Sequence, residues 1–599
     1  MMNSGNAYNA KHLKTEQIAN SFVPSNKFKE TAVNGHTLLF GPRGSGKTTL
    51  LRMLSLDILP NWSHKDADDI RKDIHYEGVY VPGDLVWGQM IRSLSKAGIE
   101  ENCANAFAYT AFCTHVFLAV IDTLGASLKY HVKVYGTEIL DSNSDEIHDS
   151  FKFIARTLKL DLDKISLPRI RSELSLRLNR LGEYSQQAIE NKAITLKVLR
   201  DDLPYSSIDL KTALDAIFSE FDHALNRPEH RWAILLDEFE IAPKILLDKV
   251  IQSMRSSAKK IMFKVALVPC GLHQETEAEI SKNNDHSVVE LWYREKGESQ
   301  TFCNDILRSR YNISDPYAVF GKTMFINNKQ TSKDDRSEMW AKEFHSLMEK
   351  DVSFKEYIET RNIDFERVLS GKEKSSIYNT IRKIAPRIAF RNAFKRDDNT
   401  SKGRKVPFEF YAGWDAITRI SEGNPRWLIT TINSLYETIS KNGSVGQEEQ
   451  YNKIYAASEA YSSMLATTAL TNNMGITTKE SPYEIIKDIA KFFNKVLTKE
   501  DFKADPPGTF VIDQKVSSEI EMAMRIALNH GAIVSLEKNL DFWNYKSLFG
   551  MRFRLSYLFS PTLKLPLRME KKVNLSSILL RGPVSKNSIV VQEDMFNEI

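Results

Sequence analysis

One segment restricts the fold of this chain more than any other: GPRGSGKT at residues 41–48. It matches G-x-x-x-x-G-K-[ST], a pattern in which small residues let consecutive backbone N–H groups surround a phosphate at the N-terminus of a helix. The apolar run His36–Phe40 comes directly before it, and leucines follow at helical spacing from Thr49 to Leu59. A glycine-rich surface turn would have neither neighbour. Strand, loop and helix together predict a phosphate-binding loop in an α/β sheet.

The side chains of this loop predict ATP and Mg²⁺ as cofactors. Lys47 is expected to reach the β- and γ-phosphate oxygens, and the Thr48 hydroxyl is expected to bind Mg²⁺, which prefers oxygen ligands. The residues predicted to surround the nucleotide phosphates are Gly41, Pro42, Arg43, Gly44, Ser45, Gly46, Lys47, Thr48 and Thr49.

Two neighbouring carboxylates follow a second apolar run, Trp232–Leu236. Asp237, at the end of a buried strand beside the loop, is expected to hold Mg²⁺ through its water shell. Glu238 is the candidate general base, which polarises the water that attacks the γ-phosphate. Taken alone, LLDEFE also fits a strand end with solvated acids. The loop at residues 41–48 favours the catalytic interpretation.

Further strands are predicted at Tyr76–Val81, Ile261–Val268 and His286–Trp292, with helical segments between them. Strands that alternate with helices indicate a parallel, doubly wound sheet. Residues 85–226 are mainly helical in pattern and separate the two nucleotide motifs. The predicted fold class is therefore α/β, a P-loop NTPase sheet with large helical insertions.

At 599 residues the chain is longer than one hydrophobic core usually serves, so several domains are expected. Helices followed by a two-stranded hairpin near the C-terminus suggest a winged helix. The predicted units are a lead-in over residues 1–35, a P-loop ATPase domain over 36–320, a charged insertion with flexible edges over 321–405, a helical lid over 406–475, a winged-helix-like domain over 480–575 and a tail over 576–599.

The segment Ala106–Leu128 is apolar and long enough to raise the question of a membrane span. His115 and Asp122 within it would be costly at the centre of a bilayer, so we expect a buried core helix. The N-terminus lacks the apolar region of a signal peptide, and the four cysteines lack the spacing of a zinc site or a disulfide framework. We therefore predict a cytoplasmic protein without membrane contact.

Charge is nearly balanced, with 81 Lys and Arg against 77 Asp and Glu, so any nucleic-acid site must be local. Two stretches mix basic and other residues in a way that contacts phosphates and bases in some proteins. A solvated face of a half-buried strand or helix gives the same patterns. The stretches are residues 550–572, with Arg552, Arg554, Lys564 and Arg568 among Phe553, Tyr557 and Phe559, and residues 381–396, with Arg382, Lys383, Arg387, Arg391, Lys395 and Arg396.

Four segments together resemble the AAA+ branch that contains origin-recognition-type initiators and their bacterial STAND-like relatives. They are FVPSNKF from Phe22, GPRGSGKTTLL from Gly41, ILLDEFE from Ile234 and SEGNPRWLI over Ser421–Ile429. Alone, GNPR is an ordinary turn with proline in the first turn of a helix. The resemblance covers most of the chain and implies an AAA+-like P-loop fold with a helical lid and a C-terminal winged helix that touches DNA. It also implies that Arg426 is the sensor-2 residue, which acts with Glu238 and Lys47 in catalysis, and that Phe22 and Val23 contact the adenine.

The sequence departs from this family's pattern at two points. The fourth strand of the family usually ends in a polar sensor-1 residue, and here it ends in VPCG at residues 268–271, with Cys270 a poor candidate. The arginine finger that usually stands between the fourth and fifth strands is missing. Arg294, Arg308 and Arg310 follow the fifth strand, where they are interpreted as surface or helix-face arginines more readily than as fingers. Slow turnover that depends on a partner or on DNA is expected.

These observations predict a cytoplasmic regulatory ATPase that switches conformation with its nucleotide state and controls a protein partner. By resemblance to bacterial members, its setting would be phage defence or mobile-element biology. The alternative is an ATP-dependent DNA-binding or DNA-loading factor in replication or transposition. An effector nuclease lacks support, since no second cluster of Asp, Glu and His with metal spacing is evident. The sequence leaves open whether the protein is an oligomer.

Overall fold

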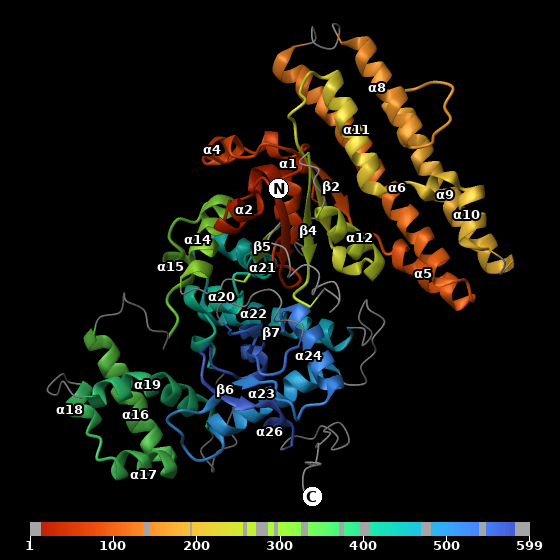
Figure 1. Cartoon of the computed structure of the whole chain (residues 1–599). Coiled ribbons are helices and arrows are strands. Elements are labelled where there is room, and N and C mark those ends of the chain that lie inside the picture. Colours follow the sequence, from red (N-terminus) through yellow and green to blue (C-terminus); the bar gives the residue numbers. More distant parts are fainter. Residues whose placement is uncertain are drawn as a thin grey trace, which may run out of the picture.

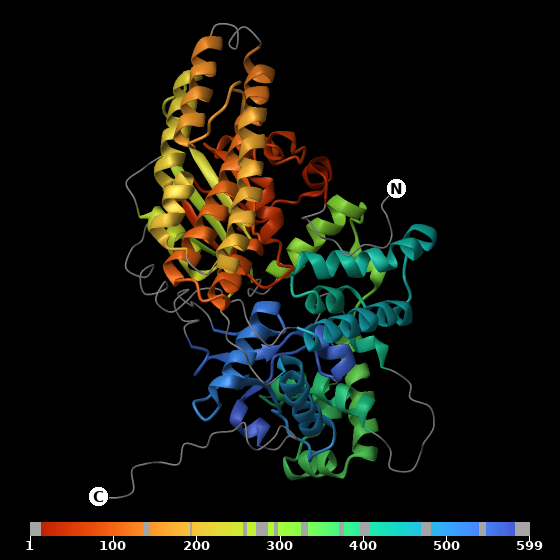
Figure 2. The same cartoon turned by 90° about the vertical axis from the view of Figure 1, so that its right-hand side faces the viewer.

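A computed structural model of the chain describes residues 13–136, 143–191, 194–255, 260–270, 286–292, 297–324, 333–369, 376–395, 407–468, 481–537 and 547–580. A sheet domain with a long helical insertion forms the upper part of the molecule in Figure 1, and the C-terminal half of the chain forms the lower part. The insertion rises from the sheet domain as a bundle of long helices, which is clearest in Figure 2.

The upper domain is built on a five-stranded sheet in the order β2-β3-β4-β1-β5. Every neighbouring pair of its strands is parallel, which confirms the predicted parallel α/β fold. Parallel strands place their carboxyl ends at one edge of the sheet, so the segments that follow β1, β3 and β4 lie close together. The strands are β1 (His36–Phe40), β2 (Glu77–Pro82), β3 (Trp232–Asp237), β4 (Ile261–Leu267) and β5 (His286–Glu290).

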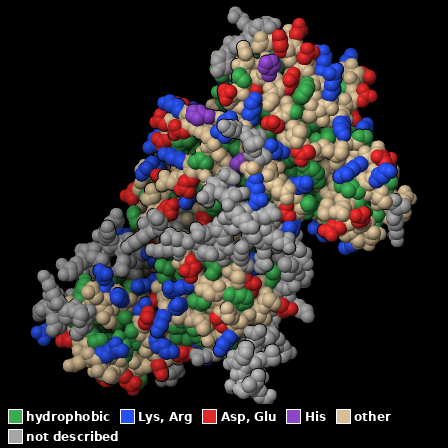
Figure 3. All heavy atoms as spheres, viewed as in Figure 1, with side chains coloured by type: hydrophobic (Ala, Val, Ile, Leu, Met, Phe, Trp, Pro, Cys, Tyr) green, Lys and Arg blue, Asp and Glu red, His purple; other side chains and the backbone are tan. Residues whose placement is uncertain are grey.

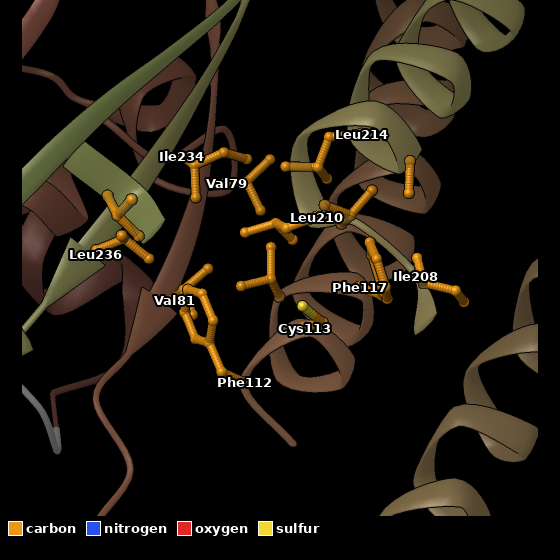
Figure 4. Close-up of a cluster of buried hydrophobic side chains, with 14 of the residues drawn as sticks. Val79, Val81, Phe112, Cys113, Phe117, Ile208, Leu210, Leu214, Ile234 and Leu236 are labelled. Atoms are coloured by element: carbon orange, nitrogen blue, oxygen red, sulfur yellow. The ribbon is translucent and has the colours of Figure 1, made fainter. Parts of the chain in front are cut away.

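Both faces of the sheet are buried. In β3, Ile234 and Leu236 face the helical insertion while Leu235 faces the opposite side, as the two-residue period of a strand requires. Figure 4 shows Ile234 and Leu236 packed opposite Phe112 and Leu210 of the insertion. The insertion comprises α5 (Val86–Lys96), α6 (Glu101–Tyr135), α8 (Ser144–Thr157), α9 (Leu167–Asn191), α10 (Leu196–Asp202) and α11 (Leu210–Ala224), and α12 (Lys244–Met254) lies on the same face.

Helix α6 contains the apolar stretch that raised the membrane question. Within the described residues it is the one helix long and apolar enough to cross a membrane. Many of its apolar side chains, Phe107 and Val116 among them, are fully buried against α5, α9 and the sheet, while Tyr130 and Val134 near its C-terminal end are exposed. This is the environment that we predicted for a core helix.

The other face of the sheet is covered by α1 (Thr15–Ser21), α2 (Asn26–Thr31), α3 (Lys47–Met53) and α4 (Ala67–Lys72). On this face Lys264 of β4 is fully buried. Its Nζ donates hydrogen bonds to the carbonyl oxygens of Thr31 at 2.8 Å, Val33 at 2.7 Å and Gly35 at 3.2 Å. The amino group of Lys264 therefore provides hydrogen bonds for three backbone carbonyl groups at the connection between α2 and β1. Strand β1 in turn leads into the phosphate-binding loop.

Lys264→Met is expected to lower the free energy of unfolding by about 2 kcal/mol, because buried carbonyl groups lose their donor while the side-chain volume is kept. Thermal and urea unfolding of the full chain would measure it. Lys65→Met replaces an exposed lysine and serves as the matched control, with an expected change within about 0.5 kcal/mol. Equal stabilities of the two variants would contradict the structural role of Lys264.

A second core joins the helices of the predicted lid to the C-terminal unit. The predicted lid contains α20 (Trp414–Ile420), α21 (Pro425–Asn442) and α22 (Gln447–Ala466). Two helices that precede it in the chain, α14 (Glu298–Tyr311) and α15 (Pro316–Phe320), share the same core. The C-terminal unit contains α23 (Pro482–Thr498), β6 (Pro507–Val511), α24 (Ser518–His530), β7 (Ile533–Ser535), β8 (Arg552–Leu555), α25 (Ser560–Leu563), β9 (Lys571–Asn574) and α26 (Leu575–Leu579).

The C-terminal strands form a sheet in the order β7-β8-β6-β9. The sequence predicted the two strands that became β7 and β8. It did not predict β6, which begins at Pro507-Gly508, because this dipeptide is typical of a turn. The winged-helix assignment and the other domain boundaries stay predictions.

The predicted charged insertion is more ordered than its sequence indicated. Within residues 321–405 the chain forms α16 (Lys333–Lys350), α17 (Val352–Thr360), α18 (Phe365–Leu369) and α19 (Ser376–Phe394). Phe344, Phe354 and Ile381 build a separate core to which Phe502 of the C-terminal unit contributes. These helices lie beside the C-terminal unit at the lower left of Figure 1. The many charged residues on the outer faces of these helices made the apolar residues of their inner faces hard to recognise in the sequence.

Candidate nucleotide-binding site

The segment between β1 and α3 has the backbone of a phosphate-binding loop. Gly44 and Gly46 have φ angles of +87° and +99°, which L-residues with a Cβ rarely adopt. A Cβ on Gly41 would lie 2.5 Å from Ser45 Oγ, so this position also requires glycine. Helix α3 begins at Lys47, directly after the loop. The loop therefore directs its amides and the positive end of a helix dipole toward one point.

Lys47 is held inside the loop. Its Nζ donates hydrogen bonds to the carbonyl oxygens of Gly41 at 2.6 Å and Pro42 at 3.2 Å. Burial lowers the pKa of Lys47, and the carboxylates of Glu240 and Asp237 oppose that shift. The ammonium group is thus close to two acids and to the position where a phosphate would bind.

Asp237 ends β3 and is fully buried. Its Oδ2 accepts a hydrogen bond of 2.8 Å from the Tyr80 hydroxyl on β2, and Oδ1 has no hydrogen-bond partner within the described part of the chain. Burial raises the pKa of Asp237, while hydrogen bonds from Tyr80 and Thr48 oppose the change. A buried carboxylate oxygen beside a threonine hydroxyl is a donor set that fits Mg²⁺ and its water ligands.

Glu238 has an unusual backbone. Its φ of +50° places a non-glycine residue in the left-handed region, which costs free energy and is found preferentially at functional sites. This turn at the end of β3 places Glu238 and Glu240 on the wall of the same cavity. Burial raises the pKa of Glu240, and Lys47 opposes the change.

The cavity has a volume of about 580 Å³, which is large enough for a nucleotide. Three cations and three carboxylates contribute to its lining. They are Arg43, Lys47, Arg426, Asp84, Glu238 and Glu240. The cations suit a polyphosphate, and the acids suit a hydrated divalent cation and the activation of water. The residues therefore fit a magnesium nucleotide, with Thr48 also in the wall.

Arg426 reaches this cavity from the lid. It lies in the first turn of α21, which is capped by Asn424: Oδ1 of Asn424 accepts from the Arg426 amide at 3.0 Å. Asn424 Nδ2 in turn donates to the Arg43 carbonyl of the loop at 3.3 Å. Partial burial lowers the pKa of Arg426, and the Glu238 carboxylate opposes the shift. The structure thus brings Arg426, Glu238 and Lys47 together, as the sequence predicted.

A smaller pocket adjoins this cavity, and the two share Gly46, Thr49 and Pro425 in their walls. Phe22 and Val23 contribute to its mainly apolar lining together with Phe302 and Ile306 of α14. An apolar pocket next to a phosphate-binding loop suits a flat aromatic base. The position of Phe22 and Val23 agrees with their predicted contact to adenine.

Of the alternative arginines, Arg308 and Arg310 do not line the cavity that would hold the phosphates. Arg310 lines the apolar pocket, on the face of α14 that carries Phe302 and Ile306. Arg308 is exposed and lies 3.7 Å from Asp305. Arg294 lies outside the described residues. Arg310 therefore lines the pocket of Phe22 and Val23 and not the cavity of Lys47.

Helix α6 of the insertion also contacts the cavity wall, through His115. The sequence had singled out His115 only because it would be unfavourable at the centre of a bilayer. Trp87 Nε1 donates to His115 Nδ1 at 2.8 Å, and His115 Nε2 lies 3.5 Å from Oδ2 of Asp84. Asp84, Tyr80 and Glu240 were absent from the predicted site. Tyr80 lies near the end of the predicted strand Tyr76–Val81, but only the pairing of β2 with β3 places it beside Asp237.

The comparisons with known proteins agree with this geometry. A family model described as ORC-CDC6-like matches residues 3–575. The chain belongs to the ORC-CDC6-like family. Membership confirms the predicted resemblance and the AAA+ P-loop fold, and it implies nucleotide binding, usually with Mg²⁺. Neither the search of curated proteins nor the search of solved structures gave a match.

Two arginines of the basic and aromatic hairpin in this ORC-CDC6-like chain make contacts within the molecule, and contact of the hairpin with nucleic acid stays a prediction. Arg554 forms two hydrogen bonds with the Glu422 carboxylate, at 2.6 and 2.5 Å. Arg552 donates to Thr509 Oγ1 at 2.9 Å. Phe553 and Phe559 are fully buried. Arg554 thus joins the C-terminal unit to the turn before α21, while Lys564 of the same stretch is exposed.

The second basic stretch, on α19, is also used in part for internal contacts. Arg387 pairs with Glu570, and Arg391 pairs with Asp351. Arg382 and Lys383 are exposed, and Arg396 lies outside the described residues. In the view of Figure 3, Lys and Arg are interspersed with Asp and Glu over the described surface, without a large area of one sign.

Proposed function

We propose that this ORC-CDC6-like protein is an ATP-hydrolysing switch, whose nucleotide state sets the position of the lid and the C-terminal unit and thereby controls a protein partner. The observation that carries the proposal is one cavity to which the sheet domain contributes Lys47 and Glu238 and the lid contributes Arg426. A γ-phosphate bound there would contact both parts at once. A ligand that bridges two parts in one state and loses the bridge on hydrolysis shifts their equilibrium.

The residues suggest how the chain would hydrolyse ATP. Lys47 would exchange its two carbonyl acceptors for phosphate oxygens, and Arg426 would stabilise the charge that develops on the γ-phosphate. Glu238 would accept a proton from the attacking water as the bond between the γ-phosphorus and the bridging oxygen breaks and ADP leaves. Mg²⁺, held at Thr48 and Asp237, would neutralise charge on the phosphate oxygens.

Lys47→Ala is expected to weaken binding of ATP with Mg²⁺ by about 10–100-fold, because a charge-assisted contact to phosphate is lost. Titration of a fluorescent ATP analogue, with unlabelled ATP as competitor, measures the change. Lys65→Ala, at an exposed position, is the control and should bind like the wild type. Failure of the wild type to bind ATP, or an unchanged Kd in Lys47→Ala, would reject the proposed function.

The protein partner and its setting in phage defence or mobile-element biology rest on family resemblance. The alternative of an ATP-dependent DNA-loading factor loses its main support, since the hairpin arginines pair with residues of this chain. Retention of duplex DNA at low salt, lost as salt is raised and dependent on ATP, would favour this alternative over the switch.

A further inference from the structure

The turn that ends α24 in the C-terminal unit lies directly on the phosphate-binding loop. The Asn529 carbonyl oxygen accepts a hydrogen bond of 3.1 Å from the backbone N–H of Arg43. The Asn529 side chain reaches a second segment, since Oδ1 accepts a hydrogen bond of 2.8 Å from the backbone N–H of Cys270. One residue, far from both segments in the sequence, thus bonds to the loop after β1 and to the end of β4.

The two residues beside Asn529 strengthen this contact. Gly531 has a φ of +77°, and a Cβ there would lie 3.1 Å from Cβ of Pro42 in the loop. The His530 carbonyl oxygen accepts a hydrogen bond of 2.9 Å from the Tyr461 hydroxyl on α22. Three consecutive residues therefore connect the C-terminal unit to the phosphate-binding loop and to the lid.

The imidazole of His530 is uncharged in this contact. Burial, and to a smaller extent the positive charge of Arg43, lower its pKa to about 4. His530 and Ser45 both line a small cavity between the loop, the lid and the C-terminal unit. Neither His530 Nδ1 nor Ser45 Oγ has a hydrogen-bond partner among the described residues, and both are buried. At neutral pH the uncharged imidazole of His530 therefore does not repel the positive charge of Arg43.

The place at which Asn529 contacts the sheet domain gives the contact its significance. Strand β4 lies between β3 and β1. The loop with Arg43 follows β1 and Cys270 follows β4, while Asp237 ends β3 and Glu238 comes directly after it. Val268, Pro269 and Cys270 bring no charged or amide side chain to the end of β4. A movement of the turn at Asn529 would change the distance between the loop and the end of β4, on the side where Glu238 lines the cavity.

From these contacts we infer that Asn529 is a positioning residue of the nucleotide site, which makes hydrolysis depend on docking of the C-terminal unit onto the phosphate-binding loop. The inference rests on the proposed ATPase function and extends it, because it names the element through which the C-terminal unit and its partner would control turnover. Asn529 acts through the backbone of Arg43 and Cys270 and need not touch the nucleotide.

Asn529→Ala tests the inference, since it leaves the buried Cys270 N–H without its acceptor. We expect kcat for ATP hydrolysis to fall about tenfold while the Kd for ATP changes less than about threefold. Hydrogen exchange of the nucleotide-free protein should become faster in peptides that cover residues 41–48 and 261–270. Asn529→Asp keeps an acceptor oxygen and should restore the slow exchange. Asn442→Ala, at the exposed end of α21, is the matched control.

Several results would overturn the inference. One is a kcat for Asn529→Ala within twofold of the wild type. Another is a hydrogen-exchange rate of this variant equal to that of the wild type. A third is faster hydrogen exchange throughout the molecule, which indicates general destabilisation. A wild type that binds but does not hydrolyse ATP would instead reject the ATPase function on which the inference rests. The exchange experiment distinguishes the two failures, because it needs no nucleotide.

Discussion

Glu238→Gln is expected to lower kcat for ATP hydrolysis by about 10²–10⁴-fold, the contribution that a positioned general base typically makes. The amide keeps the shape of the side chain but cannot accept the proton of the attacking water. ATP binding should stay within about threefold of the wild type, because the phosphate contacts of Lys47 and the loop are retained. Phosphate release under saturating ATP with Mg²⁺ gives kcat, and competition with a fluorescent analogue gives the Kd.

Glu240 is the alternative candidate for the general base, and the same experiment distinguishes it from Glu238. It lies in the same cavity wall and is close enough to Lys47 for the two to affect each other's pKa. If Glu238→Gln keeps more than half of the wild-type kcat and Glu240→Gln loses it, the base is Glu240 and the assignment of Glu238 is wrong. Glu229→Gln, at an exposed position before β3, controls for the loss of one negative charge.

The parts of the site that the sequence predicted are those with strong local patterns. The loop at residues 41–48 and the pair Asp237-Glu238 are contiguous, and each sits between apolar runs of recognisable period. The five strands of the sheet could be located for the same reason. Arg426 was found through a short segment that resembles a known family, and the structure places it on the cavity.

The parts that the sequence did not predict depend on contacts between distant residues. Tyr80 meets Asp237 only because β2 pairs with β3. Asn529 reaches Arg43 and Cys270 only because the C-terminal unit docks on the sheet domain. Neither residue has a periodic or compositional signal. The hairpin lacks such a signal too: its alternating pattern predicted a solvated or nucleic-acid-binding face for Arg554, which is paired with Glu422.

In the predicted charged insertion, too, contacts between distant residues bury charged side chains that looked exposed in the sequence. Its charge-rich sequence predicted an insertion with flexible edges, yet one of its arginines is the most buried arginine among the described residues. Arg391 of α19 is 2% exposed and Asp351, between α16 and α17, is 1% exposed. Arg391 Nε donates to Asp351 Oδ2 at 2.5 Å, and its other nitrogens donate to the carbonyl oxygens of Leu497 and Glu500, both at 2.7 Å. This guanidinium joins the insertion to the C-terminal unit.

Arg391→Met is therefore expected to lower the free energy of unfolding by about 3–5 kcal/mol, the cost of leaving a buried charge and buried carbonyl groups without their partner. Methionine keeps most of the apolar volume, so the loss reflects the polar contacts. Urea unfolding and thermal scans of the full chain measure it. Arg382→Met, at an exposed position on the same helix, should change stability by no more than about 0.5 kcal/mol.

The pH dependence of stability provides an independent check on this pair. Hydrogen bonds from Arg391, Lys395 and Ser353 outweigh the effect of burial and lower the pKa of Asp351 from 3.8 to about 2. A carboxylate with a lowered pKa in the folded state stabilises the protein above pH 4 and loses that contribution as pH falls from about 4 to 2. The wild type should lose stability over this range more steeply than Asp351→Asn. Identical slopes, or an Arg391→Met variant as stable as Arg382→Met, would contradict the buried pair.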